Sequence, residues 1–258
     1  MVGREEITVL RWWLLAAAAL AAGPAAANEG SGYNWGWYVV NPFQDKGWSN
    51  LKFLAEGAGA TLLVSVCAIA LSVVLGATVA LAGLSRRKTL NRLSRGYVEL
   101  FRAIPLLVLL LWVFYGLPVI IGLQLGVFAT GVLSLALSDS AFEAEVFRAG
   151  IQSVPKGQIE AAKSLGLSWT QQMRLVVLPQ AIKVILPALG NQFVYVVKMS
   201  SLISVIGLQE LTRRANELNV SEYRPLEIYT LLVLEYLILI LIVSYLVRRL
   251  ERRLATGN

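Results

Sequence analysis

Long uncharged stretches dominate the pattern of this sequence. Residues 57–85 and 103–138 contain no charged side chain, and residues 228–247 contain only Glu235. A helix rises about 1.5 Å per residue, so each stretch can cross the roughly 30 Å hydrocarbon layer of a membrane. The pattern therefore predicts an all-α integral membrane protein.

The stretch 103–138 is too long for one crossing. Four residues that interrupt helices lie near its middle: Gly116, Pro118, Gly122 and Gly126. We therefore expect two spans joined by a short turn. A further span is expected from about Pro187 to about Leu208, which places Lys198 within or near the apolar layer. The sequence thus predicts about five transmembrane helices.

Basic residues gather in three regions, at 86–102, 148–183 and 248–253. Arginine and lysine are enriched in cytoplasmic loops, so we expect these regions and the C-terminus to be cytoplasmic, with the mature N-terminus periplasmic. The segment 209–227 must then lie outside, although it carries three arginines. The formal net charge of +7 is largely an orientation signal and indicates no nucleic-acid partner.

The first 27 residues have the pattern of a secretory signal peptide. Two arginines precede the short apolar stretch WWLLAAAALAAG, and three alanines then offer a cleavage site. Residues 1–27 are therefore either cleaved or retained as an extra N-terminal helix. In both cases we expect residues 28–53 in the periplasm, where their many Trp and Tyr side chains suit an anchor at the membrane interface.

The sequence offers little for catalysis. It has no histidine and one cysteine, Cys67, which excludes the commonest general base, the commonest metal ligand and any intrachain disulfide. No G-x-x-x-x-G-K-[ST] loop occurs, so the chain should not bind ATP as a P-loop protein does. We expect no catalytic residue, no metal site and no cofactor on this chain.

A polar insert at residues 149–183 interrupts the apolar pattern. The residues before Gly166 favour a short helix that this glycine would end. Ser168 and Gln171 fit a capping box, so a second helix should begin there and end near Pro179. The insert is therefore expected to be a pair of short helices between the third and fourth spans, a shape that can dock into a cleft.

One pattern in the insert runs Glu160-Ala161-Ala162, then Gly166, then Val176-Val177-Leu178-Pro179. It resembles the EAA signature of permease subunits of bacterial binding-protein-dependent ABC importers. The stretches 99–118, 142–168 and 191–211 are similar to the polar amino-acid subfamily of these permeases. Met199 and Ser200 depart from it, because acidic and threonine residues are frequent there.

The resemblance implies a type I ABC importer architecture, with the transmembrane domain over residues 54–258. It also implies which residues contact an ATPase subunit that holds ATP and Mg²⁺: Glu160, Ala161, Ala162, Gly166, Leu178 and Pro179. The other implied partners are a second permease subunit, identical or related, and a periplasmic amino-acid-binding protein. The implied location is the bacterial inner membrane, within its lipid.

Four ionisable residues lie within or close to the expected spans: Asp139, Glu143, Lys198 and Glu235. A charge there is expensive unless it is paired or wetted, so each is a candidate for the substrate pathway. In one account the acids bind the ammonium group of an amino acid and Lys198 its carboxylate. In the other, which we favour for Lys198, this lysine and one acid form a structural pair between helices.

These observations predict a non-enzymatic permease that forms the pathway of an ATP-driven importer for polar amino acids. The alternative is a stand-alone proton-coupled carrier that uses Asp139, Glu143 and Glu235 as a relay. That carrier would leave the polar insert without a purpose. An intramembrane enzyme would need a nucleophile and base, and the sequence shows no such arrangement.

Overall fold

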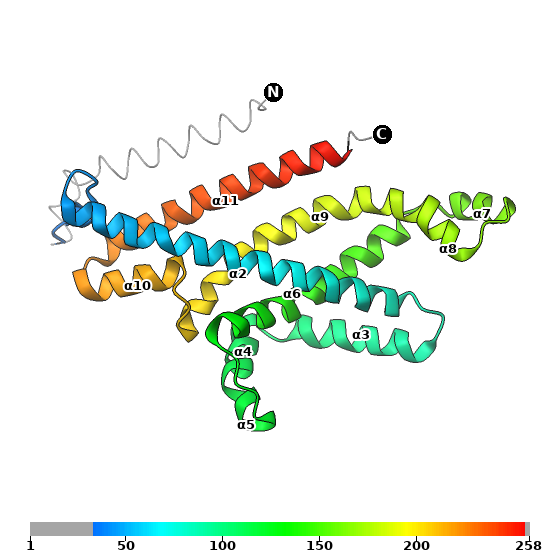
Figure 1. The fold of residues 1–258 in the computed structure, drawn as a ribbon, viewed down its shortest axis with the longest axis horizontal. Helices are drawn as coiled ribbons and strands as arrows, with labels where there is room; N and C mark the ends of the chain where they lie inside the picture. Colours follow the sequence, from blue (N-terminus) through cyan, green and yellow to red (C-terminus); the bar gives the residue numbers. More distant parts are fainter. Residues whose placement is uncertain (1–32, 256–258) are drawn as a thin grey trace.

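The computed structural model describes residues 33–255, and every regular element in this range is helical. The expected signal-like segment, residues 1–27, lies outside the described residues. Four helical segments are long and apolar enough to cross a membrane, and a bent helix pair is a fifth candidate. The four are α2 (Asp45–Gly83), α6 (Val127–Gln152), the segment Trp169–Ile206 and α11 (Pro225–Ala255). Figure 1 shows them running along the long axis of the molecule, in agreement with the all-helical prediction.

The first span is longer than the apolar pattern indicated. Helix α2 begins at Asp45, whereas the uncharged run begins at Gly57. Asp45 lies in the first turn, where its carboxylate stabilises the helix by interacting with the positive end of the helix dipole. Part of the expected periplasmic segment 28–53 is therefore helix, and another short turn, η1 (Trp37–Val40), packs against α2.

The stretch 103–138 divides as predicted, at Gly122, whose φ of 70° ends the first part. That part is itself irregular. It consists of α4 (Leu106–Leu111), a π-helical turn η2 (Trp112–Gly116) and α5 (Leu117–Ile121).

Helix α3 (Lys88–Ala103) precedes the segment 106–121, and the sequence did not reveal it. The two are bent from each other by 100°. Pro105 explains the bend, because it pushes the preceding Ile104 out of helical geometry, to a ψ of 122°.

The second short helix, which was expected to begin at Ser168 and to end near Pro179, is not a separate helix. Helix α8 (Trp169–Gln172) continues through a π-helical turn η3 (Met173–Val177) into α9 (Leu178–Met199) and the 3-10 turn η4 (Ser200–Ile206). Pro179 has no N–H to donate, and the wider turn that precedes it lets the helix continue without that bond. The expected end near Pro179 is therefore wrong, and the helical segment that holds the fourth span begins at Trp169.

A stripe of small residues joins α2 to its neighbours. The buried small positions on α2 recur every three or four residues: Gly57, Thr61, Ser65, Ala68, Ser72, Gly76 and Ala80. A Cβ added to Gly76 would lie 2.5 Å from the Cβ of Glu143 on α6, so α6 approaches too closely for any other residue. Small side chains are the usual means by which helices pack closely in lipid.

The three arginines in 209–227 are held by other protein groups. Arg214 forms an ion pair with Glu56 on α2 at 2.9 Å, and Arg213 forms one with Glu217 at 2.8 Å. Arg224 donates a hydrogen bond to the backbone oxygen of Asn34. Positive charge on this segment is thus used to tie α10 (Leu211–Glu222), α2 and the N-terminal residues together.

Glu210 caps α10 from a fully buried position. Its carboxylate accepts hydrogen bonds from the Arg213 N–H at 2.7 Å and from the Tyr236 hydroxyl at 2.8 Å. Burial raises the pKa of the Glu210 carboxyl, because the charged form is poorly solvated there.

We predict that Glu210→Ala lowers the free energy of unfolding by about 2 kcal/mol, since it removes the cap and a buried acceptor. Glu210→Gln keeps an oxygen for the Arg213 N–H, and its amide can donate to the Tyr236 hydroxyl. Denaturation of the chain in mild detergent, followed by tryptophan fluorescence, would compare them. Equal loss in both variants would contradict the capping role.

Candidate functional site

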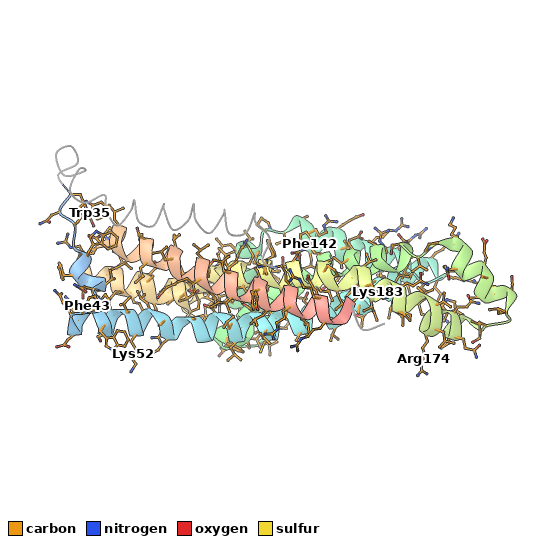
Figure 2. The ribbon with its side chains drawn as sticks, turned by 90° about the horizontal axis from the view of Figure 1, so that it is seen from above. Trp35, Phe43, Lys52, Phe142, Arg174 and Lys183 are labelled. Atoms are coloured by element: carbon orange, nitrogen blue, oxygen red, sulfur yellow. The ribbon has the colours of Figure 1, made fainter. Side chains whose placement is uncertain are left out.

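Two regions hold most of the residues that the sequence singled out, and Lys198 and Glu235 lie apart from both, on α9 and α11. One region is the helix pair between the third and fourth spans, and the other is a pair of buried acids on α6. In Figure 2, Arg174 of η3 and Lys183 of α9 lie toward the end opposite Trp35 and Phe43. The basic region 148–183 and the aromatic residues of the segment 28–53 are therefore well separated in space, as the sequence predicted.

The turn that follows α7 (Lys156–Ser164) depends on Gly166. This glycine has a φ of 74°, a left-handed conformation that residues with a Cβ rarely adopt. The N–H of Leu167 donates to Ala162 O at 3.2 Å, and the N–H of Gly166 donates to Lys163 O at 2.9 Å. These two bonds form a Schellman motif, so the predicted helix stop at Gly166 is confirmed.

The predicted capping box is also present. Gln171 N–H donates to Ser168 Oγ at 3.4 Å, while Ser168 N–H donates to Gln171 Oε1 at 2.8 Å. The two caps together fix the angle at which α7 leaves and α8 begins. The turn is thus a defined structure that can present one surface to a partner.

The signature residues divide between surface and interior. Glu160, Ala161, Gly166, Leu178 and Pro179 are exposed, whereas Ala162 is buried. The contact with a partner that the resemblance implies for both alanines is therefore open to Ala161 alone in this structure.

Three large apolar side chains lie exposed in the same region: Leu165 at the end of α7, Trp169 on α8 and Leu175 on η3. Trp169 is 66% exposed, which is unusual for so large an apolar residue in a polar segment. Together with Glu160 and Ala161 they form what we call the coupling surface. Sequence reasoning missed these three residues, although their apolar character within a polar insert was a usable signal.

The buried acids are one turn apart on α6 and have different surroundings. Asp139 accepts hydrogen bonds from Ser72 Oγ on α2 at 2.6 Å and from Gln192 Nε2 on α9 at 2.5 Å. Asp139 therefore links three helices. Ser72 and Gln192 were not identified from the sequence, although each is a polar residue in an apolar stretch.

Glu143 is fully buried, and neither of its carboxyl oxygens has a hydrogen-bond partner in the structure. A buried polar group without a partner costs about 1–3 kcal/mol, more if it is charged. Such a group needs an explanation, and a ligand or a conformational change that reaches it would supply one.

The structure does not bring Lys198 to the acids. Lys198 lies on an exposed face of α9 and forms no ion pair with any carboxylate among residues 33–255. Gln192, six residues earlier, occupies the position beside Asp139 instead, and six residues correspond to roughly 240° around a helix. The expected structural pair between Lys198 and an acid is therefore wrong.

Glu235 lies half-buried on α11. Its Oε2 atom is buried and has no hydrogen-bond partner in the described structure. The structure therefore leaves Glu235 separate from the pair on α6, and it remains a candidate by its burial alone.

Comparisons with known proteins agree on one class. Probable glutamine ABC transporter permease protein GlnM of Bacillus subtilis (strain 168) is 43% identical over 205 residues, covering 80% of this chain and 94% of that protein. Glutamine transport system permease protein GlnP of Escherichia coli (strain K12) is 35% identical over 208 residues, covering 80% and 95%. Arginine transport system permease protein ArtQ of Bacillus subtilis (strain 168) is 34% identical over 208 residues, covering 81% and 95%.

Solved structures match in the same way. A crystal structure of an amino acid ABC transporter with histidines has a TM-score of 0.75 at 40% identity, covering 80% of this chain and 96% of that one. The fold, with its exposed helix pair before the fourth span, is that of an ABC importer permease, a multi-pass transport component that is not catalytic. The family described as binding-protein-dependent transport system inner membrane component matches residues 72–256, and this chain belongs to it.

The two acids on α6 should respond differently to removal. Glu143→Met eliminates a carboxyl without partners, so we expect the free energy of unfolding to stay unchanged or to rise by up to about 2 kcal/mol. Asp139→Leu leaves Ser72 and Gln192 without their acceptor and should lower it by about 2–3 kcal/mol. Thermal unfolding in detergent compares the two variants. A loss for Glu143→Met as large as that for Asp139→Leu would show that Glu143 is structurally satisfied.

Proposed function

We propose that this chain forms the translocation pathway of an ATP-driven importer for polar amino acids of the glutamine and arginine class. The observation that carries the proposal is the combination of the coupling surface with relatives named for glutamine and arginine transport, at 34–43% identity. Family membership decides against the alternative of a stand-alone proton-coupled carrier, because the family works with a binding protein.

The coupling surface would dock into a separate ATPase subunit, which would hold ATP and Mg²⁺. This chain has no P-loop of its own, so the energy must arrive through contact. Exposed Trp169 and Leu165 would supply apolar contact area, and Glu160 would meet a basic group of the partner. The same arrangement would place the helix pair, and with it the C-terminus, on the cytoplasmic side of a bacterial inner membrane.

The helix that leaves the coupling surface leads directly to the acids. The segment Trp169–Ile206 is continuous, so a displacement at α8 would be carried along α9 as a largely rigid movement. Gln192 on α9 holds Asp139 on α6, and Asp139 holds Ser72 on α2. Closure of the ATPase would thus change the spacing of three helices at one polar point, and this change would open the pathway alternately to the two sides.

Substrate contacts follow from the same geometry. Glu143, one turn from Asp139, would become accessible when these helices separate and would bind the ammonium group of the amino acid. Glu235 is a second acidic candidate, and exposed Lys198 would face the surface completed by a second permease subunit, identical or related. A periplasmic binding protein would deliver the amino acid. The whole would follow the type I importer architecture.

The double variant Glu160→Lys, Gly166→Pro tests the coupling surface. Proline has a φ near −65° and cannot adopt the conformation of Gly166, so the turn should be lost. We expect the ATPase subunit to co-purify with the native chain in mild detergent and not with this variant, and uptake to fall roughly tenfold or more.

A matched control for this variant is Gln158→Lys, Gly157→Ala. It also adds positive charge to α7 and replaces a glycine, but Gly157 has an ordinary φ and open space for a Cβ. The control should retain the ATPase subunit. Retention by both variants, with binding-protein-stimulated ATP hydrolysis unchanged, would remove the coupling role from Glu160 and Gly166.

Energy coupling is tested with the reconstituted importer in vesicles. We expect uptake of glutamine or arginine to continue when the proton gradient is collapsed and to stop when ATP is withheld, because ATPase closure drives the movement. Uptake that follows the proton gradient and ignores ATP would contradict the proposal. Uptake of neither amino acid, with the ATPase still stimulated by a binding protein, would point to another substrate.

A further inference from the structure

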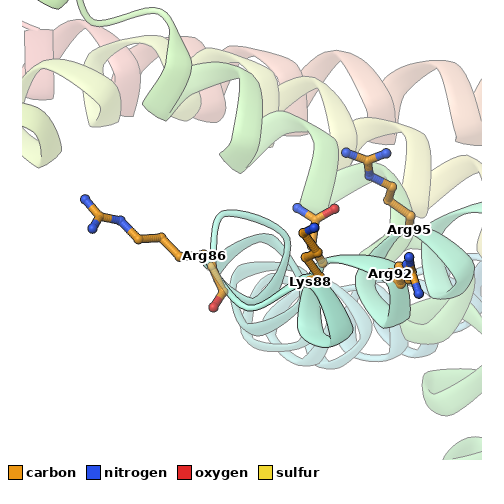
Figure 3. Close-up of a pocket in the computed structure, with 6 residues that line it drawn as sticks. Arg86, Lys88, Arg92 and Arg95 are labelled. Carbon is orange, nitrogen blue, oxygen red and sulfur yellow. The ribbon is translucent and has the colours of Figure 1, made fainter.

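A cavity lies at the turn between α2 and α3, apart from both regions described above. Its volume is about 300 Å³, and the residues that line it are Ser85, Arg86, Lys88, Asn91, Arg92 and Arg95. Figure 3 shows the four basic side chains around this turn, with Arg86 on one side and Lys88, Arg92 and Arg95 on the other. Four cations from a short segment thus surround one hollow.

The charges of these four cations are not compensated by an ion pair within the described part of the chain. None of the four forms an ion pair with a carboxylate among residues 33–255, although Glu99 lies only one turn after Arg95. The first backbone N–H groups of α3 lie at the same turn, and the helix dipole adds positive potential there. The electrostatic potential in the cavity therefore favours the binding of an anion and disfavours the binding of a cation.

The turn is held in place by bonds that do not involve the cations. Asn91 Nδ2 donates to Gly83 O, and Ser94 Oγ donates to Val79 O at 2.8 Å, so the start of α3 is tied to the end of α2. A Cβ on Gly83 would lie 2.8 Å from Ser94 Oγ, which shows how close the two helices are. The cations project from a fixed frame, which lowers the entropy lost when a ligand binds.

Exposed apolar side chains on the same two helices bear on which anion fits. They are Leu81 on α2, and Leu90 and Leu93 on α3, and Leu93 is 71% exposed. A helix with basic residues on one face and exposed leucines on another suits the boundary where lipid headgroups meet acyl chains. In Figure 1 the α7–α8 pair lies farther out along the long axis than the α2–α3 turn, so the cavity is closer to the membrane spans than the coupling surface is.

We propose that this cavity binds the phosphate group of an acidic phospholipid. The guanidinium groups of Arg92 and Arg95 would donate paired hydrogen bonds to the phosphate oxygens, and Lys88 and Arg86 would neutralise the remaining charge. The assignment to the cytoplasmic leaflet rests on the proposed orientation, whereas the binding itself is independent of transport.

The test uses the full chain in phosphatidylcholine nanodiscs, with and without phosphatidylglycerol, and counts retained lipid by native mass spectrometry. The cavity variant is Arg92→Gln, Arg95→Gln, whose side chains are exposed, so folding should be preserved. The control, Arg87→Gln, Arg249→Gln, removes the same charge from residues that do not line the cavity. We expect the affinity for phosphatidylglycerol to fall roughly 30-fold in the cavity variant and less than about threefold in the control.

Three results would overturn the proposal. Equal losses in both variants would reduce the binding to general attraction between a basic surface and acidic lipid. Displacement of the lipid by inorganic phosphate at a similar concentration would assign the cavity to free phosphate. Unchanged lipid binding in the cavity variant, together with loss of a co-purifying ATPase subunit, would assign it to an acidic protein surface.

Discussion

Close contact between α2 and α6 is the interaction on which the rest of the structure depends. Lipid tails are as apolar as leucine, so helices in a membrane gain little from burying large apolar side chains against each other. The stripe of small residues on α2 lets the two backbones approach until Gly76 meets Glu143. Only at that separation can Ser72 reach Asp139. A larger residue at position 76 would separate the helices and break the polar link along with the packing.

The same contact explains why one acid is satisfied and the other is not. Asp139 faces donors from α2 and α9, while Glu143, one turn along, faces the glycine and has no donor within reach. A protein that needed only stability would place an apolar residue there. An unsatisfied carboxyl where α2 and α6 meet is instead consistent with the proposal that this acid gains a partner in another arrangement of the helices.

The sequence could indicate four of the five expected spans because lipid imposes one demand, an uncharged run of sufficient length, whereas the fifth is a candidate only as the bent pair of α3 with the segment 106–121. The two caps at Gly166 and Ser168 were equally predictable, since each depends on a few neighbouring residues. The start of α2 at Asp45 could not be predicted in this way. Outside the lipid the ends of a helix are set by capping and packing, and not by the length of an uncharged run. The extra helix α3 was missed for the same reason.

Other features depend on contacts between distant segments. A proline after a helical pattern ordinarily indicates the end of that helix, and the π-helical turn that carries the chain past Pro179 leaves no simple mark in the sequence. The partners of Asp139 lie 67 and 53 residues away, so no local pattern could identify Gln192 in place of Lys198. What the sequence could indicate was that a charge at this depth requires a partner.

The arginines of segment 209–227 have a consequence for how the chain enters the membrane. In the proposed orientation this segment crosses to the periplasm, yet arginine favours the opposite side. Arg214 and Arg224 are held by Glu56 and by Asn34, which belong to the far end of the chain in sequence. Those bonds can form only after the segment 209–227 has packed against α2 and the residues that precede it. During synthesis the segment must therefore be translocated before Arg214 and Arg224 have these partners, and its topology has to be imposed by the stronger basic clusters on either side of it.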